Sequence, residues 1–120
     1  MMRKFWHLLM AGSVGAMSVQ AAPAETYELV VGSYTAGTSE GIYRLQFDSR
    51  TGKFQGPPVL AAKAANPSWL TLSKDQKHLF VVNENGPGQK DPVGRVSSYS
   101  IDPKNHQLTL INQVQSLGNE

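Results

Sequence analysis

The residues of this sequence that could take part in chemistry are few and stand apart from one another. Glu84 follows Asn83 at the end of a short apolar run, and its carboxylate could act as a general base or as a polar group at a pocket rim. We prefer the simpler interpretation, a carboxylate that caps the turn into Asn85-Gly86, because carboxylates in loops are usually solvated. Asn66 could point its amide into a channel, although Asn before Pro67 is first of all a turn former.

The hydroxyl and imidazole groups do not form a recognisable catalytic or metal-binding pattern. Ser33 and Thr35 flank Tyr34 near two glycines, but the Gly-x-Ser-x-Gly sequence of a nucleophile elbow is missing. We therefore expect both hydroxyls to satisfy backbone groups. His78 and His106 stand alone beside expected hairpins, and two separated imidazoles make neither a metal site nor a catalytic triad. Since the sequence also has no cysteine, we expect neither a metal nor another cofactor.

The amino-terminal segment differs from the rest of the sequence. Arg3 and Lys4 precede an uncharged run over residues 5–19, which closes on the small-residue pattern Val19-Gln20-Ala21. This arrangement predicts a secretory signal peptide over residues 1–21. A membrane anchor usually needs about 20 strongly apolar residues, whereas this run is shorter and is diluted by glycine and serine. We therefore expect a periplasmic or secreted protein with no stable membrane insertion after cleavage.

Charge argues against nucleic acid as a partner. The 120 residues include 11 Lys and Arg against 9 Asp and Glu, and the isoelectric point is near 9.0. Removing residues 1–21 takes away two of the basic residues and none of the acidic ones, so the mature chain is close to neutral. Its Lys and Arg are spread among acidic residues, and no cluster of stacking aromatic residues accompanies them. We do not expect binding to nucleic acid.

After the signal peptide, the hydrophobic pattern has the period of β-strands. Residues 41–48 place Tyr43, Leu45 and Phe47 on one face and Arg44 and Gln46 on the other. We find no convincing stripe of apolar residues at helical spacing. The predicted class is all-β, with strands at residues 27–31, 41–48, 53–61, 68–73, 78–83, 95–101 and 107–115.

The strands repeat as a larger unit. Asp48 and Asp102 each follow an alternating strand and open a hairpin turn, and they stand 54 positions apart. Val30-Val31 matches Val81-Val82 at a spacing of 51. A period of about 50 residues that contains four strands has the size of a β-propeller blade.

The repeat predicts blade one over residues 27–62 and blade two over residues 66–116. Blade two has four strands, and blade one lacks its innermost strand, which closed propellers often take from the other end of the chain. Pro57 and Pro58 fall in the outermost strand of blade one, at a sheet edge where proline costs least. Trp69 begins an innermost strand, and we expect it to pack between blades rather than to bind sugar. Two blades are part of a ring that typically has four to eight.

Several short motifs together carry a family resemblance, and they keep their order and spacing from Tyr27 to Glu120. The motifs are Val31-Gly32-Ser33-Tyr34-Thr35, Ser39-Glu40-Gly41-Ile42-Tyr43, Asp48 with Thr51-Gly52, Asn66-Pro67-Ser68-Trp69-Leu70, Leu72-Ser73-Lys74-Asp75, Val82-Asn83-Glu84 and Gly94-Arg95-Val96. With these motifs the sequence resembles the start of the lactonase family with a seven-bladed propeller. That family includes the cycloisomerase type of 6-phosphogluconolactonase and the carboxymuconate cyclases.

The resemblance implies a metal-independent enzyme acting on a small anionic lactone in the mouth of the propeller, foremost a hydrolase for a sugar lactone such as 6-phosphogluconolactone. The residues proposed to do chemistry in the family lie mainly in later blades, beyond Glu120. A similar Asn-Glu pair in a later blade is proposed to face the pocket, which makes Glu84 a catalytic candidate. Asn66 and Asn83 are candidates for substrate binding.

Two other functions stay open from the sequence. One is a non-catalytic propeller of the cell envelope that binds a protein or carbohydrate, and the other is a muconate-type cycloisomerase that forms lactones. In every case the remaining blades are needed to close the ring. We expect this chain alone to be inactive and to aggregate, because each outer blade face lacks its partner.

Overall fold

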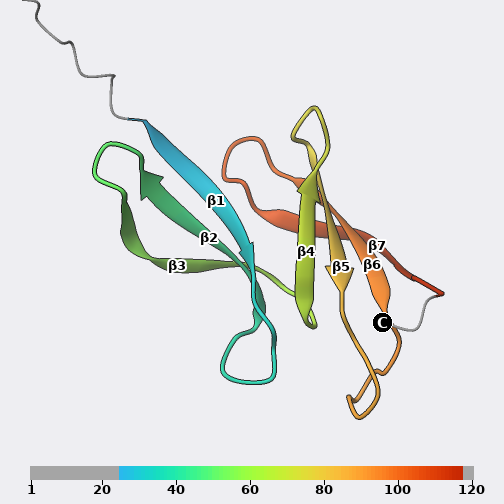
Figure 1. The fold of residues 1–120 in the computed structure, drawn as a ribbon. Helices are drawn as coiled ribbons and strands as arrows, with labels where there is room; N and C mark the ends of the chain where they lie inside the picture. The colour runs from blue at the N-terminus through green and yellow to red at the C-terminus, as the bar shows by residue number, and fades with distance from the viewer. Residues whose placement is uncertain (1–24, 118–120) are drawn as a thin grey trace, which may run out of the picture.

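The computed structural model describes residues 25–117. All the regular secondary structure in that part of the chain is β-strand. The first sheet contains β1 (Thr26–Gly32), β2 (Gly41–Asp48) and β3 (Lys53–Lys63), in that order. The second contains β4 (Pro67–Leu72), β5 (His78–Asn83), β6 (Arg95–Ile101) and β7 (Leu108–Gln115), also in chain order (Figure 1). All neighbouring strands are antiparallel. The predicted signal peptide lies outside the described residues.

These two sheets confirm the all-β class and the expected pair of blades, the first with three strands and the second with four. Strand ends differ from the prediction by one or two residues. β3 continues to Lys63 because Ala62 and Lys63 still pair with the start of β2. β4 stops at Leu72 because Ser73 already belongs to the turn, where its N–H donates to the His78 carbonyl at 2.9 Å.

The outer strand of the first sheet contains both prolines, as expected for an edge. Between the pairs Gln46–Gln55 and Arg44–Val59 the register of β2 and β3 shifts, and Pro57 lies with Pro58 inside this bulge. Proline has no N–H to give to a ladder, and it is tolerated at edges and bulges for that reason.

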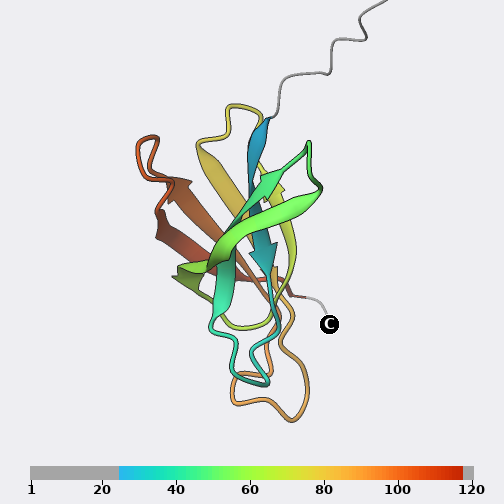
Figure 2. The ribbon, with the colours of Figure 1, turned by 90° about the vertical axis from the view of Figure 1, so that its left-hand side faces the viewer.

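The hydrophobic core lies between the two sheets. In Figure 2 the first sheet stands in front of the second, so each presents one face to the other. The buried apolar side chains form one cluster drawn from both sheets: Ile42, Ala61, Leu79, Val81, Tyr99 and Leu108. Each blade therefore buries one of its faces against its neighbour, as stacked repeats do.

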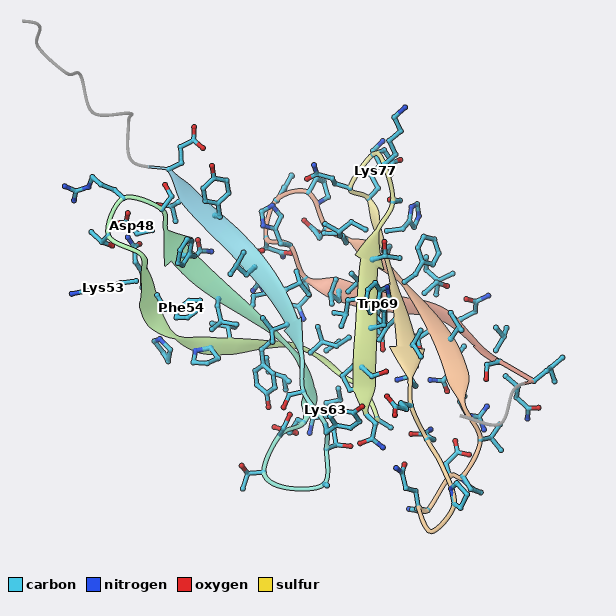
Figure 3. The ribbon with its side chains drawn as sticks, viewed as in Figure 1. Asp48, Lys53, Phe54, Lys63, Trp69 and Lys77 are labelled. Atoms are coloured by element: carbon cyan, nitrogen blue, oxygen red, sulfur yellow. The ribbon has the colours of Figure 1, made fainter. Side chains whose placement is uncertain are left out.

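The opposite faces of the two sheets are apolar and open. Phe54 on β3 packs edge-on against Phe47, with ring centroids 5.7 Å apart, yet most of its surface is exposed (Figure 3). Trp69 on β4 pairs with Val82 of β5 and is 69% exposed. Within residues 25–117 nothing covers these faces, and packing of Trp69 between blades stays a prediction.

One glycine sets how closely the two sheets approach. A Cβ added to Gly32, the last residue of β1, would lie 2.3 Å from the Pro67 carbonyl oxygen and 2.7 Å from Cδ1 of Leu70. No real Cβ tolerates such a contact with backbone. Gly32 therefore allows the end of β1 to lie against the start of β4, which brings together the loops that follow.

Candidate functional site

Three connecting segments meet at one end of the two sheets, the lower end in Figure 1. They are residues 33–40 between β1 and β2, residues 64–66 between β3 and β4, and residues 84–94 between β5 and β6. Backbone hydrogen bonds join them, because Ala64 N donates to Glu40 O at 3.1 Å and Glu84 N donates to Asn66 O at 2.9 Å. The segments form one continuous structure, which we call the loop end.

Asn66 is the centre of the loop end. Its side-chain oxygen accepts from the N–H and the hydroxyl of Thr35, each at 3.0 Å. Its side-chain nitrogen donates to Asn85 Oδ1 at 3.2 Å and to Gln89 Oε1 at 2.7 Å. The residue is 8% exposed and has φ of 40°, a left-handed conformation that asparagine tolerates better than most residues. These four hydrogen bonds use both the oxygen and the nitrogen of the amide, so the Asn66 side chain holds the connecting segments together. Substrate binding by Asn66 stays a prediction.

Asn83 lies deeper, at the end of β5, and is 1% exposed. Its nitrogen donates to the Ala65 carbonyl at 2.7 Å, while its oxygen accepts from Ser97 at 2.5 Å and from Gln113 at 3.3 Å. Gln113 also donates to Ser97 at 2.8 Å, so the network spans β5, β6 and β7. Satisfied buried networks of this kind rigidify a fold. Here too the amide serves the scaffold, and a role in substrate binding remains untested.

Glu84 has a partner that its position in the sequence does not reveal. The hydroxyl of Tyr34, in the segment after β1, donates to Glu84 Oε2 at 2.6 Å, and both side chains are exposed. This hydrogen bond, followed by desolvation, raises the pKa of the Tyr34 phenol above its usual 10.0. The preferred interpretation of Glu84 as a turn cap is therefore not what the structure shows. The carboxylate reaches the segment that follows β1 of the other sheet, while the N–H of Glu84 donates to the Asn66 carbonyl.

Two of the cavities at the loop end share walls. The larger, of about 530 Å³, is lined by Thr35, Ala36, Ala65, Asn66, Asn85, Gln89, Lys90 and Asp91. The smaller, of about 210 Å³, is lined by Tyr34, Glu84, Asn85, Gly86, Pro87 and Gln89. The side chains of Asn85 and Gln89 border both. The larger cavity has the volume of an ordinary small-molecule site.

Charge at the larger cavity comes from two neighbouring residues. Asp91 forms an ion pair with Arg95, with Oδ2 2.7 Å from Nε, and this contact with Arg95 lowers the pKa of the Asp91 carboxyl. Lys90 borders the cavity beside this pair. A cavity bordered by one ammonium group and several amides can hold a small polyhydroxylated or anionic molecule.

The other candidate residues from the sequence, Thr35, Ser33 and His78, take part in hydrogen bonds of the fold. Thr35 satisfies a backbone group as expected, since its hydroxyl oxygen accepts from Asn66 N at 3.3 Å. Ser33 bonds through its backbone, with its N–H donating to Gly41 O at 2.9 Å. His78 begins β5 beside a hairpin, and its N–H donates to the Ser73 hydroxyl at 3.0 Å.

Sequence reasoning missed a polar cluster at the opposite end. His106 sits in a turn as expected, but its Nδ1 lies 2.9 Å from Glu28 Oε1 of the other sheet. Arg44 Nη1 lies 3.7 Å from Glu28 Oε2 and donates to the Asn105 carbonyl. A signal was available in the sequence, because Glu28 alternates in phase with Val30 and so occupies the inward face of β1. A charge at such a position predicts a partner across the interface.

Two searches of the described residues were negative. Between residues 25 and 117 no three or more His, Cys, Asp or Glu side chains gather closely enough to hold a metal ion. The same stretch contains no helix of the length and hydropathy required to cross a membrane.

The chain belongs to the lactonase family described as "Lactonase, 7-bladed beta-propeller", whose sequence profile matches residues 28–120. The two sheets are therefore blades of a β-propeller, and the expected family is confirmed.

Similar proteins of this family include enzymes named for sugar lactones. The periplasmic gluconolactonase PpgL of Pseudomonas aeruginosa is 49% identical, with a TM-score of 0.72 over 79% of this chain and 26% of that one. The 6-phosphogluconolactonase of Bacillus subtilis is 39% identical over 82 residues, 68% of this chain and 22% of the relative. This chain thus spans about a quarter of the length of the proteins it matches.

Proposed function

We propose that this chain is part of a sugar lactonase, and that the whole protein hydrolyses a gluconolactone or its 6-phosphate. The observation that carries the proposal is the family match over residues 28–120, together with 49% identity to a gluconolactonase. The name of the Bacillus subtilis relative supports the phosphorylated substrate as the alternative within this class.

The reaction requires little from the protein beyond positioning and charge. Water adds to the carbonyl carbon of the lactone, and the bond between that carbon and the ring oxygen breaks. The ring oxygen takes a proton, and the product acid ionises at neutral pH, so each turnover releases one proton. Hydrogen-bond donors that stabilise the developing oxyanion supply most of the acceleration in such reactions. The loop end would contribute one polar wall of the site, with Glu84 and the neighbouring cavities.

The proposal also places the whole protein in the periplasm and includes further blades that close the ring. The signal-peptide pattern over residues 1–21 and the periplasmic location in the name of the Pseudomonas relative support export to the periplasm. The open faces of both sheets support further blades as neighbours, because an uncovered apolar face of this size needs a partner. The substrate partner is a small sugar lactone, and nucleic acid is not one.

A pH-stat assay tests the function. The protein encoded by the longest reading frame that contains this sequence is expected to release acid from D-glucono-δ-lactone or 6-phosphogluconolactone well above the buffer rate. Residues 25–117 alone serve as the matched control and are expected to be inactive. No rate above buffer on either lactone would contradict the proposal and favour a binding propeller. Lactone formation from a muconate would instead favour a cycloisomerase.

A further inference from the structure

We infer that Tyr34 and Glu84 form a hydroxyl-binding pair, in which Glu84 accepts hydrogen bonds from ring hydroxyls of the sugar and Tyr34 holds the carboxylate in position. The inference rests on the proposed function, since it names the part of the lactone that these residues recognise. It makes Glu84 a specificity-determining residue and Tyr34 a positioning residue.

The carboxylate has unused accepting capacity. Tyr34 donates to Oε2 at 2.6 Å, a length typical of a hydroxyl bound to a charged oxygen. Among residues 25–117 no group donates to the other oxygen, Oε1. An ionised carboxylate offers about four acceptor sites and no donor, so it suits neighbouring hydroxyls, which can donate to it.

The pair is held from the backbone before any ligand arrives. The N–H of Glu84 is fixed on the Asn66 carbonyl at 2.9 Å. The residue next to Tyr34, Thr35, is fixed on the Asn66 side chain by two bonds of 3.0 Å. One buried asparagine therefore sets the positions of both partners, which come from different sheets. Preorganisation of this kind reduces the entropy lost when a ligand binds.

The space beside the pair fits part of a sugar. The cavity of about 210 Å³ that both side chains border is smaller than a typical ligand site, which suits one edge of a ring better than a whole molecule. The adjoining cavity of about 530 Å³ shares Asn85 and Gln89 as walls and can take the remainder. Glu84 would repel an anion, so the hydroxyl-bearing edge of the sugar faces it, and a phosphate lies elsewhere.

Tyr34 keeps its proton under working conditions. Its hydrogen bond to Glu84 raises the pKa of the phenol above 10.0, so at neutral pH the hydroxyl remains a donor. Tyr34 is 54% exposed and borders the smaller cavity, within reach of a ligand there.

Two lactones separate recognition of hydroxyls from catalysis. In the full-length protein, Glu84→Gln is expected to raise KM for D-glucono-δ-lactone about tenfold, the loss typical for a hydrogen bond to a charged group, with kcat unchanged. KM for δ-valerolactone, a ring without hydroxyls, is expected to stay the same. Tyr34→Phe is expected to raise KM for gluconolactone less, by about threefold, because it loosens the carboxylate without removing it. A large fall in kcat on both lactones would overturn the inference and identify Glu84 as a general base.

A binding experiment distinguishes failure of the inference from failure of the proposed function. The probe is 1,5-anhydro-D-glucitol, a neutral ring that carries the hydroxyls of gluconolactone but cannot be hydrolysed, and its binding is followed by ligand-observed NMR. Binding to the wild type that weakens about tenfold in Glu84→Gln, without lactonase activity, would reject the function and keep the hydroxyl-binding pair. No binding to the wild type, or equal binding to both proteins, would overturn the inference.

The chain contains a matched control. The Tyr27 hydroxyl donates to Glu25 at the other end of β1, which is about 20 Å long. Glu25→Gln and Tyr27→Phe are expected to leave both KM values and binding unchanged. Spectrophotometric titration of the tyrosines adds a direct readout, since Glu84→Gln should lower the pKa of Tyr34 toward 10.0. If Glu84→Gln does not fold, Tyr34→Phe carries the same comparison of the two lactones.

Discussion

The two ends of the blade pair are held together in different ways. At the loop end, near Lys63 in Figure 3, the buried amides of Asn66 and Asn83 each join several segments through three or four hydrogen bonds. At the hairpin end, near Asp48 and Lys77, each turn is satisfied mainly by its own aspartate. The loop end is therefore a tertiary structure, whereas the hairpin end is a set of local turns.

The hairpin turns show how local this end is. Asp48 accepts from the N–H groups of Arg50 and Thr51 at 2.9 and 3.2 Å. Asp102 does the same for the residues two and three positions after it, at 2.7 and 3.2 Å. The polar connections between the sheets here are the partly exposed cluster around Glu28 and one hydrogen bond, from Gln107 Nε2 to the Ala61 carbonyl at 3.2 Å. The comparison indicates that rigid geometry, which a binding site needs, is built at the loop end.

The largest effect is expected from Asn66→Ala. The change removes four side-chain hydrogen bonds and leaves the buried Asn85 and the half-buried Thr35 without these partners. It also places alanine at a φ of 40°, a left-handed backbone conformation that is unfavourable for alanine. We expect a loss of about 3 kcal/mol in the free energy of unfolding, measured by urea denaturation of the full-length protein. Asn112→Ala on the exposed edge strand removes only an exposed hydrogen bond from the Ser98 hydroxyl; it is the control and should change the free energy of unfolding by about 0.5 kcal/mol or less. Equal effects would show that the loop end has no special role.

The next effect in size is expected from Gly32→Ala. The new methyl group would meet the Pro67 backbone at 2.3 Å, so β1 and β4 must move apart. Overpacking of this kind costs about 2 kcal/mol, and the melting temperature should fall accordingly. Gly37→Ala provides the control, because nothing lies within 4 Å of its added Cβ. A melting temperature as high as that of the control would mean that the sheets are not in close contact here.

A smaller effect is expected at the hairpin end from Glu28→Gln. The change weakens the contacts with His106 and Arg44, which are partly exposed to solvent, and should cost about 1 kcal/mol or less. Because salt screens exposed charges, the difference from wild type should shrink in concentrated NaCl. A loss as large as that of Asn66→Ala would contradict the contrast between the two ends.

The smallest effect is expected from Asp48→Asn, and it should depend on pH. Backbone N–H donors, first that of Thr51, lower the pKa of the Asp48 carboxyl below its usual 3.8 in the folded protein. The ionised carboxylate therefore stabilises the fold at pH above 3.8, and this contribution is lost as pH falls through the lower folded value. The melting temperatures of wild type and variant should differ slightly at neutral pH and converge in strong acid. A difference that does not change with pH would rule out the charge as its cause.

The sequence was sufficient for the parts of the fold that depend on neighbouring residues. Alternation over residues 41–48 predicted β2, and the spacing of Asp48 from Asp102 predicted two equivalent hairpins. Pro57 and Pro58 predicted the edge strand. Period and turn chemistry act within a few residues, so a reader of the sequence can apply them directly.

The site depends on contacts that no local rule describes. Tyr34 and Glu84 are 50 positions apart and meet because Gly32 lets the sheets approach. Asn66 was recognised as a turn former, and the turn exists. The four hydrogen bonds of its side chain, however, reach three residues in segments that lie before and after it in the sequence. Such contacts follow from the stacking of blades, which the sequence pattern does not specify residue by residue.

The open edge of β1 has a consequence for the order of events during synthesis. Within residues 25–117, β1 pairs with β2 alone, so its other side presents unpaired backbone groups. An edge of this kind can pair with any extended chain, including the same edge strand of a second, incompletely folded copy of the protein. If the strand that pairs with this edge of β1 is synthesised last, the first blade to be synthesised is the last to complete its sheet. The time during which the edge of β1 is unpaired, rather than the stability of the folded protein, would then determine how much of the protein aggregates before it is folded.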